Sequence, residues 1–205
     1  MLLPARRQAV DGLEIVALTR DRWDDVQALF ERPGPRGGIP IPGNCWCMAW
    51  RDDQGHRLER KAAFKGCLDQ GSLLGLLAYR DDTPVGWVAI SPRADQTRLE
   101  RSRQYGPMPG DQNVYAVTCF YVDRDLRGIG ISSALLDAAI GFARDVGATA
   151  LDAFPKLELP RHALESRRAE ENESFMGRRA SYEARGFVVV RETGKRAVMR
   201  LSFTK

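Results

Sequence analysis

The fold is decided by one stretch, Arg127-Gly128-Ile129-Gly130-Ile131-Ser132, which joins two segments of opposite character. Before it, residues 114–122 form an apolar run rich in β-branched and aromatic residues, which predicts a strand. After it, apolar residues recur at helical spacing as far as Gly147, which predicts a long amphipathic helix ended by that glycine. A strand, a glycine turn and a helix in this order favour a sheet covered by helices.

The turn also has the chemistry of an anion site. The first N–H groups of a helix have no partner within the helix and lie at the positive end of its dipole. Glycines let the backbone approach a ligand without interference from a Cβ atom, so the stretch predicts a phosphate cradle. It is not a Rossmann fingerprint, because Ser133 stands at the last glycine position, and no Gly-Lys-Ser/Thr of a Walker loop follows. An ordinary tight turn is the alternative interpretation.

These residues resemble the GNAT acetyltransferases. That family carries Gln/Arg-x-x-Gly-x-Gly/Ala here, followed by a helix that often begins Ser-Ala-Leu-Leu. This chain has the same pattern up to Ser132, which stands where glycine or alanine is usual, and then reads Ser133-Ala134-Leu135-Leu136. Residues 120–123, Phe-Tyr-Val-Asp, resemble the end of the family's central strand, and residues 182–187, Tyr-Glu-Ala-Arg-Gly-Phe, match its pattern Tyr-x-x-x-Gly-Phe.

The resemblance implies one GNAT-like domain over residues 1–205. The expected fold is α/β (α+β), with a central mixed, mostly antiparallel twisted sheet and helices on both faces. In the family, the central strand splays from its parallel neighbour, and its free backbone groups hold the pantetheine and the acetyl carbonyl of the co-substrate. The chain is thus expected to be an N-acetyltransferase that uses acetyl-CoA and no metal.

The resemblance also assigns the site residues. The turn is expected to bind the pyrophosphate of acetyl-CoA, and the splayed strand the rest of the cofactor. The predicted cofactor-binding residues are Phe120, Tyr121, Val122, Arg127, Gly128, Ile129, Gly130, Ile131, Ser132 and Ser133.

The chemistry needs an amine that loses its proton, a donor for the oxyanion and an acid for the departing thiolate. Backbone N–H groups of the splayed strand suit the oxyanion. Tyr182 is the predicted acid, because a phenol with an ordinary pKa near ~10 is protonated at neutral pH; a packing tyrosine is the alternative. Some relatives have a glutamate base where this chain has Ala116. Without that glutamate, water can accept the proton of the amine. The other candidates for the base are loop carboxylates: Asp52, Asp53, Glu100, Asp111 and Glu173.

The rest of the chain alternates between strands and helices. Strands are expected at residues 13–18, 45–50, 73–79, 84–90, 148–154, 186–191 and 197–203. Helices are expected after Thr19 as far as Phe30, at residues 57–70 and at residues 175–185. Long loops are expected at residues 33–43 and 91–112, and a loop or inserted helix at 155–173.

Cysteine and tryptophan gather in the segment Cys45-Trp46-Cys47-Met48-Ala49-Trp50. Such residues either pack in the core or line an acceptor pocket, and core packing is the favoured interpretation. Cys119 is likewise interpreted as a buried small apolar residue rather than a nucleophile.

Composition excludes several classes of protein. Hydrophobic residues make up 43% and charged residues 28% of the chain, and neither a membrane-spanning run nor a signal peptide is evident. The four cysteines are scattered, which argues against a disulfide framework or a zinc site and favours the cytoplasm. The net charge of +4 suits an anionic ligand but not a nucleic-acid-binding stripe.

Three functions stay open at this point. A small amine or amino-acid-like acceptor is the first expectation, because the long loops can close over a small substrate. A protein, peptide or aminoacyl-tRNA acceptor is the second. A catalytically inactive acyl-CoA sensor is the third, because the strand carboxylate is missing. A homodimer is expected only by analogy with the fold.

Overall fold

The computed structural model describes residues 12–34, 37–51, 55–109, 111–156, 174–192, 194 and 196–203. Its strands form a seven-stranded sheet in the order β1-β2-β3-β4-β5-β7-β6. Only β4 and β5 pair in parallel, and every other neighbouring pair is antiparallel. The strands are β1 (Leu13–Ala17), β2 (Leu76–Arg80), β3 (Thr83–Pro92), β4 (Val114–Val122), β5 (Ala150–Ala153), β6 (Val188–Glu192) and β7 (Ala197–Ser202).

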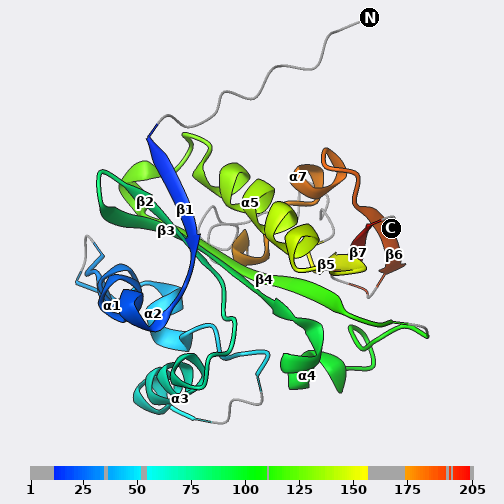
Figure 1. The fold of residues 1–205 in the computed structure, drawn as a ribbon, viewed down its shortest axis with the longest axis horizontal. Helices are drawn as coiled ribbons and strands as arrows, with labels where there is room; N and C mark the ends of the chain where they lie inside the picture. Colours follow the sequence, from blue (N-terminus) through cyan, green and yellow to red (C-terminus); the bar gives the residue numbers. More distant parts are fainter. Residues whose placement is uncertain are drawn as a thin grey trace, which may run out of the picture.

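Helices lie on both faces of this sheet (Figure 1). Helices α5 (Ile131–Asp145) and α7 (Arg179–Glu183) cover one face. The other face carries α1 (Trp23–Glu31), α2 (Ile41–Cys45), α3 (Arg57–Asp69) and α4 (Thr97–Glu100). The expectation of a mixed, mostly antiparallel sheet between two layers of helices is therefore confirmed.

Strand β4 loses its parallel neighbour halfway along its length. It pairs with β3 from Tyr115 to Val122, but it pairs with β5 only from Val114 to Val117. The β3–β4 register also shifts between Ala89 and Ile90, which marks a bulge in the pair. From Thr118 onward, the edge of β4 that faces β5 has no strand partner. This is the splayed pair that the resemblance implies.

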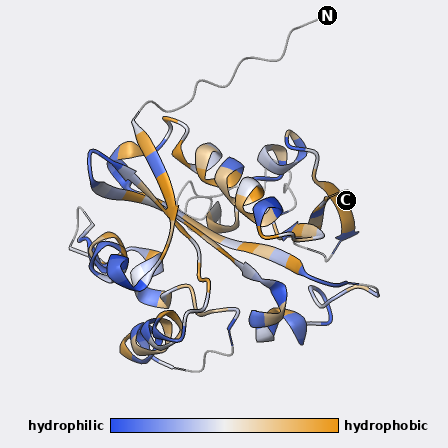
Figure 2. Cartoon of the chain, in the orientation of Figure 1, coloured by the Kyte–Doolittle hydropathy of each residue, from blue (hydrophilic) through white to orange (hydrophobic). Residues whose placement is uncertain are grey.

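Helix α5 sits directly on the sheet beside this gap. Its buried stripe includes Ile131, Leu135 and Ala139, and Figure 2 shows alternating hydrophobic and hydrophilic residues along it, as expected of a helix with one buried face. Gly86 of β3 makes the close contact possible, since a Cβ atom there would lie 3.0 Å from Cγ2 of Ile131. Gly147, with φ of 72°, follows the helix as predicted.

The expected strand at residues 45–50 is wrong. Helix α2 ends at Cys45, and the next two residues, Trp46 and Cys47, have φ of 48° and 50°. Two successive left-handed residues turn the chain, so no strand forms. Packing explains this strained turn: Trp46 is fully buried and stacks on Trp23 at 5.5 Å between ring centroids. The rings of Phe30 and Phe64 also pack against Trp46, with ring centroids 5.3 and 5.6 Å away. Within the segment, Trp46 and Met48 are buried in the core as interpreted, whereas Ala49 is exposed and the other three residues are partly buried.

Other boundaries also differ from the sequence expectation. The loop at 33–43 includes the start of α2, and the loop at 91–112 includes α4. The helix expected at 175–185 is divided into a 3₁₀ helix at Ser174–Met176 and α7, because Gly177 between them has φ of 81°. Most of the expected segment 155–173 lies outside the described residues, as do residues 35 and 36 of the first loop.

Replacing Trp46 by alanine should lower the free energy of unfolding by about 3–5 kcal/mol, because the change empties the centre of the aromatic cluster. Urea unfolding measures the loss. Leu58→Ala is the control, because Leu58 is 70% exposed and its truncation should cost less than about 0.5 kcal/mol. Equal effects of the two changes would contradict the packing described for Trp46.

Candidate functional site

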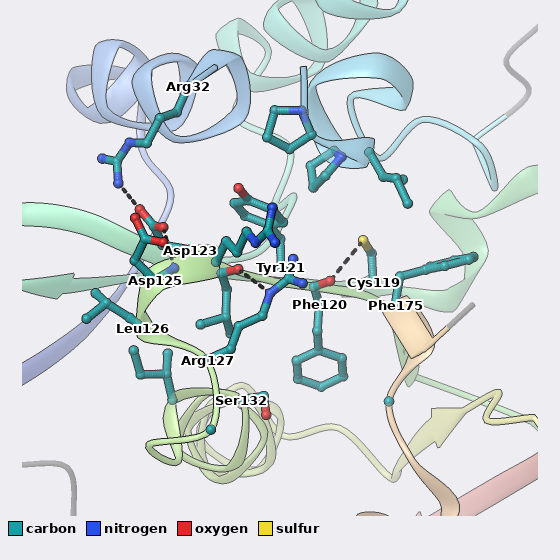
Figure 3. A pocket seen from close by; sticks show the side chains of 18 of the residues that line it. Arg32, Cys119, Phe120, Tyr121, Asp123, Asp125, Leu126, Arg127, Ser132 and Phe175 are labelled. Carbon is teal, nitrogen blue, oxygen red and sulfur yellow. Dashed lines mark hydrogen bonds and ion pairs between the residues drawn. The ribbon is translucent and has the colours of Figure 1, made fainter. Parts of the chain in front are cut away.

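A cavity of about 1230 Å³ opens beside the free edge of β4 (Figure 3). Its walls come from four parts of the chain: the end of β4, the glycine turn with the start of α5, the segment from Arg32 to Pro42, and the segment from Phe175 to Tyr182. The cavity therefore joins both faces of the sheet at the point where the sheet opens. This arrangement suits a long ligand that crosses between layers.

The glycine turn presents a row of backbone donors to this cavity. Gly128 and Gly130 have φ of 85° and 103°, which other residues adopt only with strain. No described group accepts a hydrogen bond from the amides of residues 128–133. Gly128, Gly130, Ile131, Ser132 and Ser133 line the cavity, whereas Ile129 does not and its side chain is 47% exposed. The turn and the N-terminus of α5 thus have the geometry of an anion cradle.

Strand β4 contributes side chains in opposite directions. Phe120 and Val122 pack against the cluster on the α5 face, whereas Cys119 and Tyr121 pack against the cluster around α1 and α2. All four line the cavity. Burial raises the pKa of Tyr121, as does the nearby carboxylate of Asp123.

Arg127 contacts the backbone at the end of β4. Arg127 donates from Nε to the carbonyl oxygen of Val122 at 3.3 Å, so this carbonyl points toward the turn (Figure 3). The rest of the Arg127 residue is exposed at the cavity rim. Its guanidinium stays available to a ligand anion.

An ion pair closes one end of the cavity. The guanidinium of Arg32 contacts the carboxylate of Asp123 and donates to the carbonyl oxygen of Pro84 at 3.4 Å (Figure 3). Asp123 is only 8% exposed and also accepts from the amide of Asp125 at 3.2 Å. Sequence reasoning missed this pair, because 91 positions separate its members and no local pattern marks either one.

Tyr182 lies in the cavity wall but is fully buried. Its hydroxyl donates to the carbonyl oxygen of Met176 at 2.7 Å, and its ring packs against Phe187 at 5.1 Å. Burial raises the pKa of this phenol well above its ordinary range. Tyr182 is therefore protonated at neutral pH, and its proton is held by a backbone carbonyl.

Two of the candidate bases are engaged elsewhere. Glu100 accepts from Arg93 at 2.7 Å. Asp111 pairs with Arg200 at 2.6 Å; burial raises the pKa of Asp111, but hydrogen bonds from Arg200 and the Met108 amide outweigh burial and lower it overall. Neither residue lines the cavity. The others, Asp52, Asp53 and Glu173, lie outside the described residues.

Ala116 is fully buried, as its place in β4 requires. Among the described residues, the only carboxylates that line the cavity are Asp123 and Asp125. Both lie beside Arg32, at the end where β4 leads into the turn (Figure 3). Across the residues that the structure describes, no group of three or more His, Cys, Asp or Glu residues is placed to hold a metal ion.

No helix within the described ranges is both long and apolar enough to span a bilayer.

A family model for the acetyltransferase (GNAT) family matches residues 23–164, which include α1, the whole of β4, the glycine turn and α5. The chain belongs to the GNAT acetyltransferase family. No curated protein matches it in sequence.

Solved structures share the GNAT fold at low sequence identity. A putative acetyltransferase from Salmonella typhimurium, solved with its cofactor acetyl-CoA, is 13% identical, with a TM-score of 0.50 and coverage of 95% of this chain and 96% of that one. The ribosomal-protein-alanine N-acetyltransferase from Brucella melitensis is 16% identical, with a TM-score of 0.51 and coverage of 93% and 99%. An N-acetyltransferase from Thermoplasma acidophilum in complex with coenzyme A is 13% identical, with a TM-score of 0.50 and coverage of 93% and 99%. At these identities the likeness establishes the fold alone.

Proposed function

We propose that this chain is a single-domain cytoplasmic enzyme that transfers an acetyl group from acetyl-CoA to a primary amine of a small molecule. The observation that carries the proposal is the cavity at the splayed edge of β4, which continues into the anion cradle at the start of α5. Family membership supplies the reaction class. The four cysteines are all free thiols, in keeping with a reducing compartment.

The residues around the cavity fit acetyl-CoA. Its pyrophosphate suits the unpaired amides at Gly128, Gly130 and Ile131, with Ser132, Ser133 and the guanidinium of Arg127 beside them. Ser132 in place of glycine or alanine leaves the amide available, and its side chain is exposed. Ile129 does not line the cavity, so any contribution that it makes is expected to come through its backbone amide.

The free edge of β4 is suited to the remainder of acetyl-CoA. When bound, the co-substrate supplies an acetyl thioester that a neutral amine can attack directly. Beyond Val117 no strand pairs with β4 on the side that faces β5, although the carbonyl oxygens of Phe120 and Val122 accept from Cys119 Sγ at 3.8 Å and Arg127 Nε at 3.3 Å. Fixed backbone N–H donors on a free strand edge can stabilise negative charge on a carbonyl oxygen without reorganising.

Tyr182 is the proposed acid. Its raised pKa keeps the proton on the phenol at working pH, and its ring lies in the cavity wall. To protonate a thiolate, the hydroxyl must exchange its hydrogen bond with the carbonyl of Met176 for one with the sulfur. The competing role is purely structural, because that hydrogen bond also ties α7 to the 3₁₀ helix before it.

No carboxylate base is proposed. Ala116 offers no proton acceptor, and Asp123 is held by Arg32. Water that exchanges with bulk solvent can take the proton from an amine. This route is favourable for amines that are already neutral in the site.

Gly130→Ala should weaken acetyl-CoA binding by at least about tenfold, the equivalent of about 1.4 kcal/mol, because an alanine at φ of 103° displaces the amides of the cradle. Calorimetry measures the affinity. Gly147→Ala is a matched control just beyond the other end of α5, where φ is 72° and the residue does not line this cavity. Both changes should cost about 1–2 kcal/mol of stability, but only the first should affect binding. If Gly130→Ala bound acetyl-CoA with the wild-type affinity, the turn would not be part of the cofactor site.

Arg32→Ala should also weaken acetyl-CoA binding, by about tenfold, because it leaves the carboxylate of Asp123 unpaired beside a polyanionic ligand. Removing the charge as well, in Arg32→Ala with Asp123→Asn, should restore most of the affinity. A double variant no better than the single one would show that charge repulsion is not the cause.

Tyr182→Phe should lower kcat by about 100-fold while acetyl-CoA affinity stays nearly unchanged, which thiol release and calorimetry measure. Tyr79→Phe is the matched control, because Tyr79 is also buried and donates to Asp25 at 2.7 Å but does not line this cavity. Because its pKa is raised, Tyr182 should cause no fall in kcat below about pH 10. Turnover at the wild-type rate would leave Tyr182 with a structural role only.

A further inference from the structure

The cavity has two chemically different ends. One end holds the glycine turn, Arg127 and the Arg32–Asp123 pair, and the other lies around Cys119 and Phe175 (Figure 3). Residues Ile39-Pro40-Ile41-Pro42 form the wall on the α1–α2 side, and all four line the cavity. Phosphate binding by the anion cradle explains the polar residues at the first end. The apolar wall is not needed for phosphate binding.

The side chains of this wall are apolar throughout. Ile41 is 40% exposed although it is a large hydrophobic residue. Tyr121, Cys119 and Phe175 extend the same surface from β4 and from the 3₁₀ helix. An apolar surface of this kind inside a cavity gains free energy when an apolar ligand covers it.

Most of the backbone of the wall is also unavailable to polar ligands, since only Ile39 and Ile41 carry N–H groups there. Pro40 and Pro42 have no N–H group. The carbonyl oxygens of Ile39 and Pro40 accept from the side-chain and backbone nitrogens of Asn44 at 3.0 and 3.2 Å, and that of Pro42 accepts from the amide of Trp46. A ligand with many hydroxyl or ammonium groups would therefore lose hydrogen bonds to water without replacement here.

Charge complementarity points the same way. The two described carboxylates that line the cavity, Asp123 and Asp125, lie at the end where Arg32 pairs with Asp123 (Figure 3), and the segment Ile39–Pro42 contributes none. A polyamine or an aminoglycoside needs several carboxylates to replace its hydration. Apolar surroundings also lower the pKa of a bound ammonium group, which raises the neutral fraction of the amine. Such a pocket requires no carboxylate base, in agreement with Ala116.

We propose that the acceptor is a primary amine carried on an apolar group, aromatic or branched aliphatic, which packs against Ile39–Pro42 and the ring of Tyr121. The inference rests on the acetyltransferase function proposed above. The hydroxyl of Tyr121 has no hydrogen-bond partner among the described residues, so the wall also offers one polar contact. The amine nitrogen forms the new amide bond as the C–S bond of the thioester breaks. The proton of the amine passes to water, and the departing thiolate takes a proton from Tyr182, which solvent then reprotonates.

The test measures thiol release from acetyl-CoA by the full chain with four amines at equal concentration and pH. Two are apolar, 2-phenylethylamine and 3-methylbutylamine, and two are hydrophilic, ethanolamine and 1,4-diaminobutane. The apolar amines should give kcat/KM at least about tenfold higher, the scale expected for methylene groups in an apolar pocket. An equal or reversed order would overturn the inference and leave the acetyltransferase intact.

The variant Ile41→Ser tests whether the wall formed by Ile39–Pro42 binds the acceptor. It should lower kcat/KM for 2-phenylethylamine by about tenfold and leave the affinity for acetyl-CoA unchanged. Val190→Ser is the matched control, because Val190 is 38% exposed on β6 and does not line the cavity. Equal losses in the two variants would contradict the assignment of the wall.

A measurement of acetyl-CoA binding distinguishes failure of this inference from failure of the proposed acetyltransferase function. If calorimetry detects no acetyl-CoA binding, the proposed function fails. If acetyl-CoA binds but only a peptide N-terminus gives thiol release, the apolar-amine inference fails and the result favours a peptide acetyltransferase. If acetyl-CoA binds but no acceptor gives thiol release, the inference also fails and the result favours a sensor.

Discussion

The separation of β4 from β5 beyond Val117 is the constraint on which the rest of this structure depends. A continuous parallel pair would use the backbone groups of β4 for the sheet and leave no opening. Because the pair ends after four positions, the edge from Thr118 onward stays free and a cavity of about 1230 Å³ forms beside it. The long antiparallel pairing with β3 holds β4 in place despite this loss.

Helix α5 stabilises that opening. Its N-terminus lies at the end of β4, and its buried stripe rests on β3 through the space that Gly86 leaves. The sheet therefore positions the helix, and the helix positions the unpaired amides of the turn. The anion cradle and the free strand edge are consequences of the same packing.

The opposite face of the sheet determines the other wall of the cavity. Trp46 is buried among Trp23, Phe30 and Phe64, and the turn that follows α2 adopts left-handed backbone angles to allow it. This cluster fixes α2 against α1 and so holds Ile39–Pro42 beside the cavity. Arg32 at the end of α1 connects the same region to Asp123 at the end of β4. Core packing and site geometry are thus coupled on both faces.

Local sequence patterns were enough to predict the strand at residues 114–122, the glycine turn and the long helix, because each is marked by periodicity or by residues with special backbone freedom. They also indicated the family and the mixed sheet. The assignments of Tyr182 and the cofactor-binding residues stay predictions. Three features came from the folded structure alone: the turn within residues 45–50, the hydrogen bond from Tyr182 to Met176, and the ion pair of Arg32 with Asp123. These features depend on contacts between distant segments and on competition for burial, which local sequence patterns do not encode.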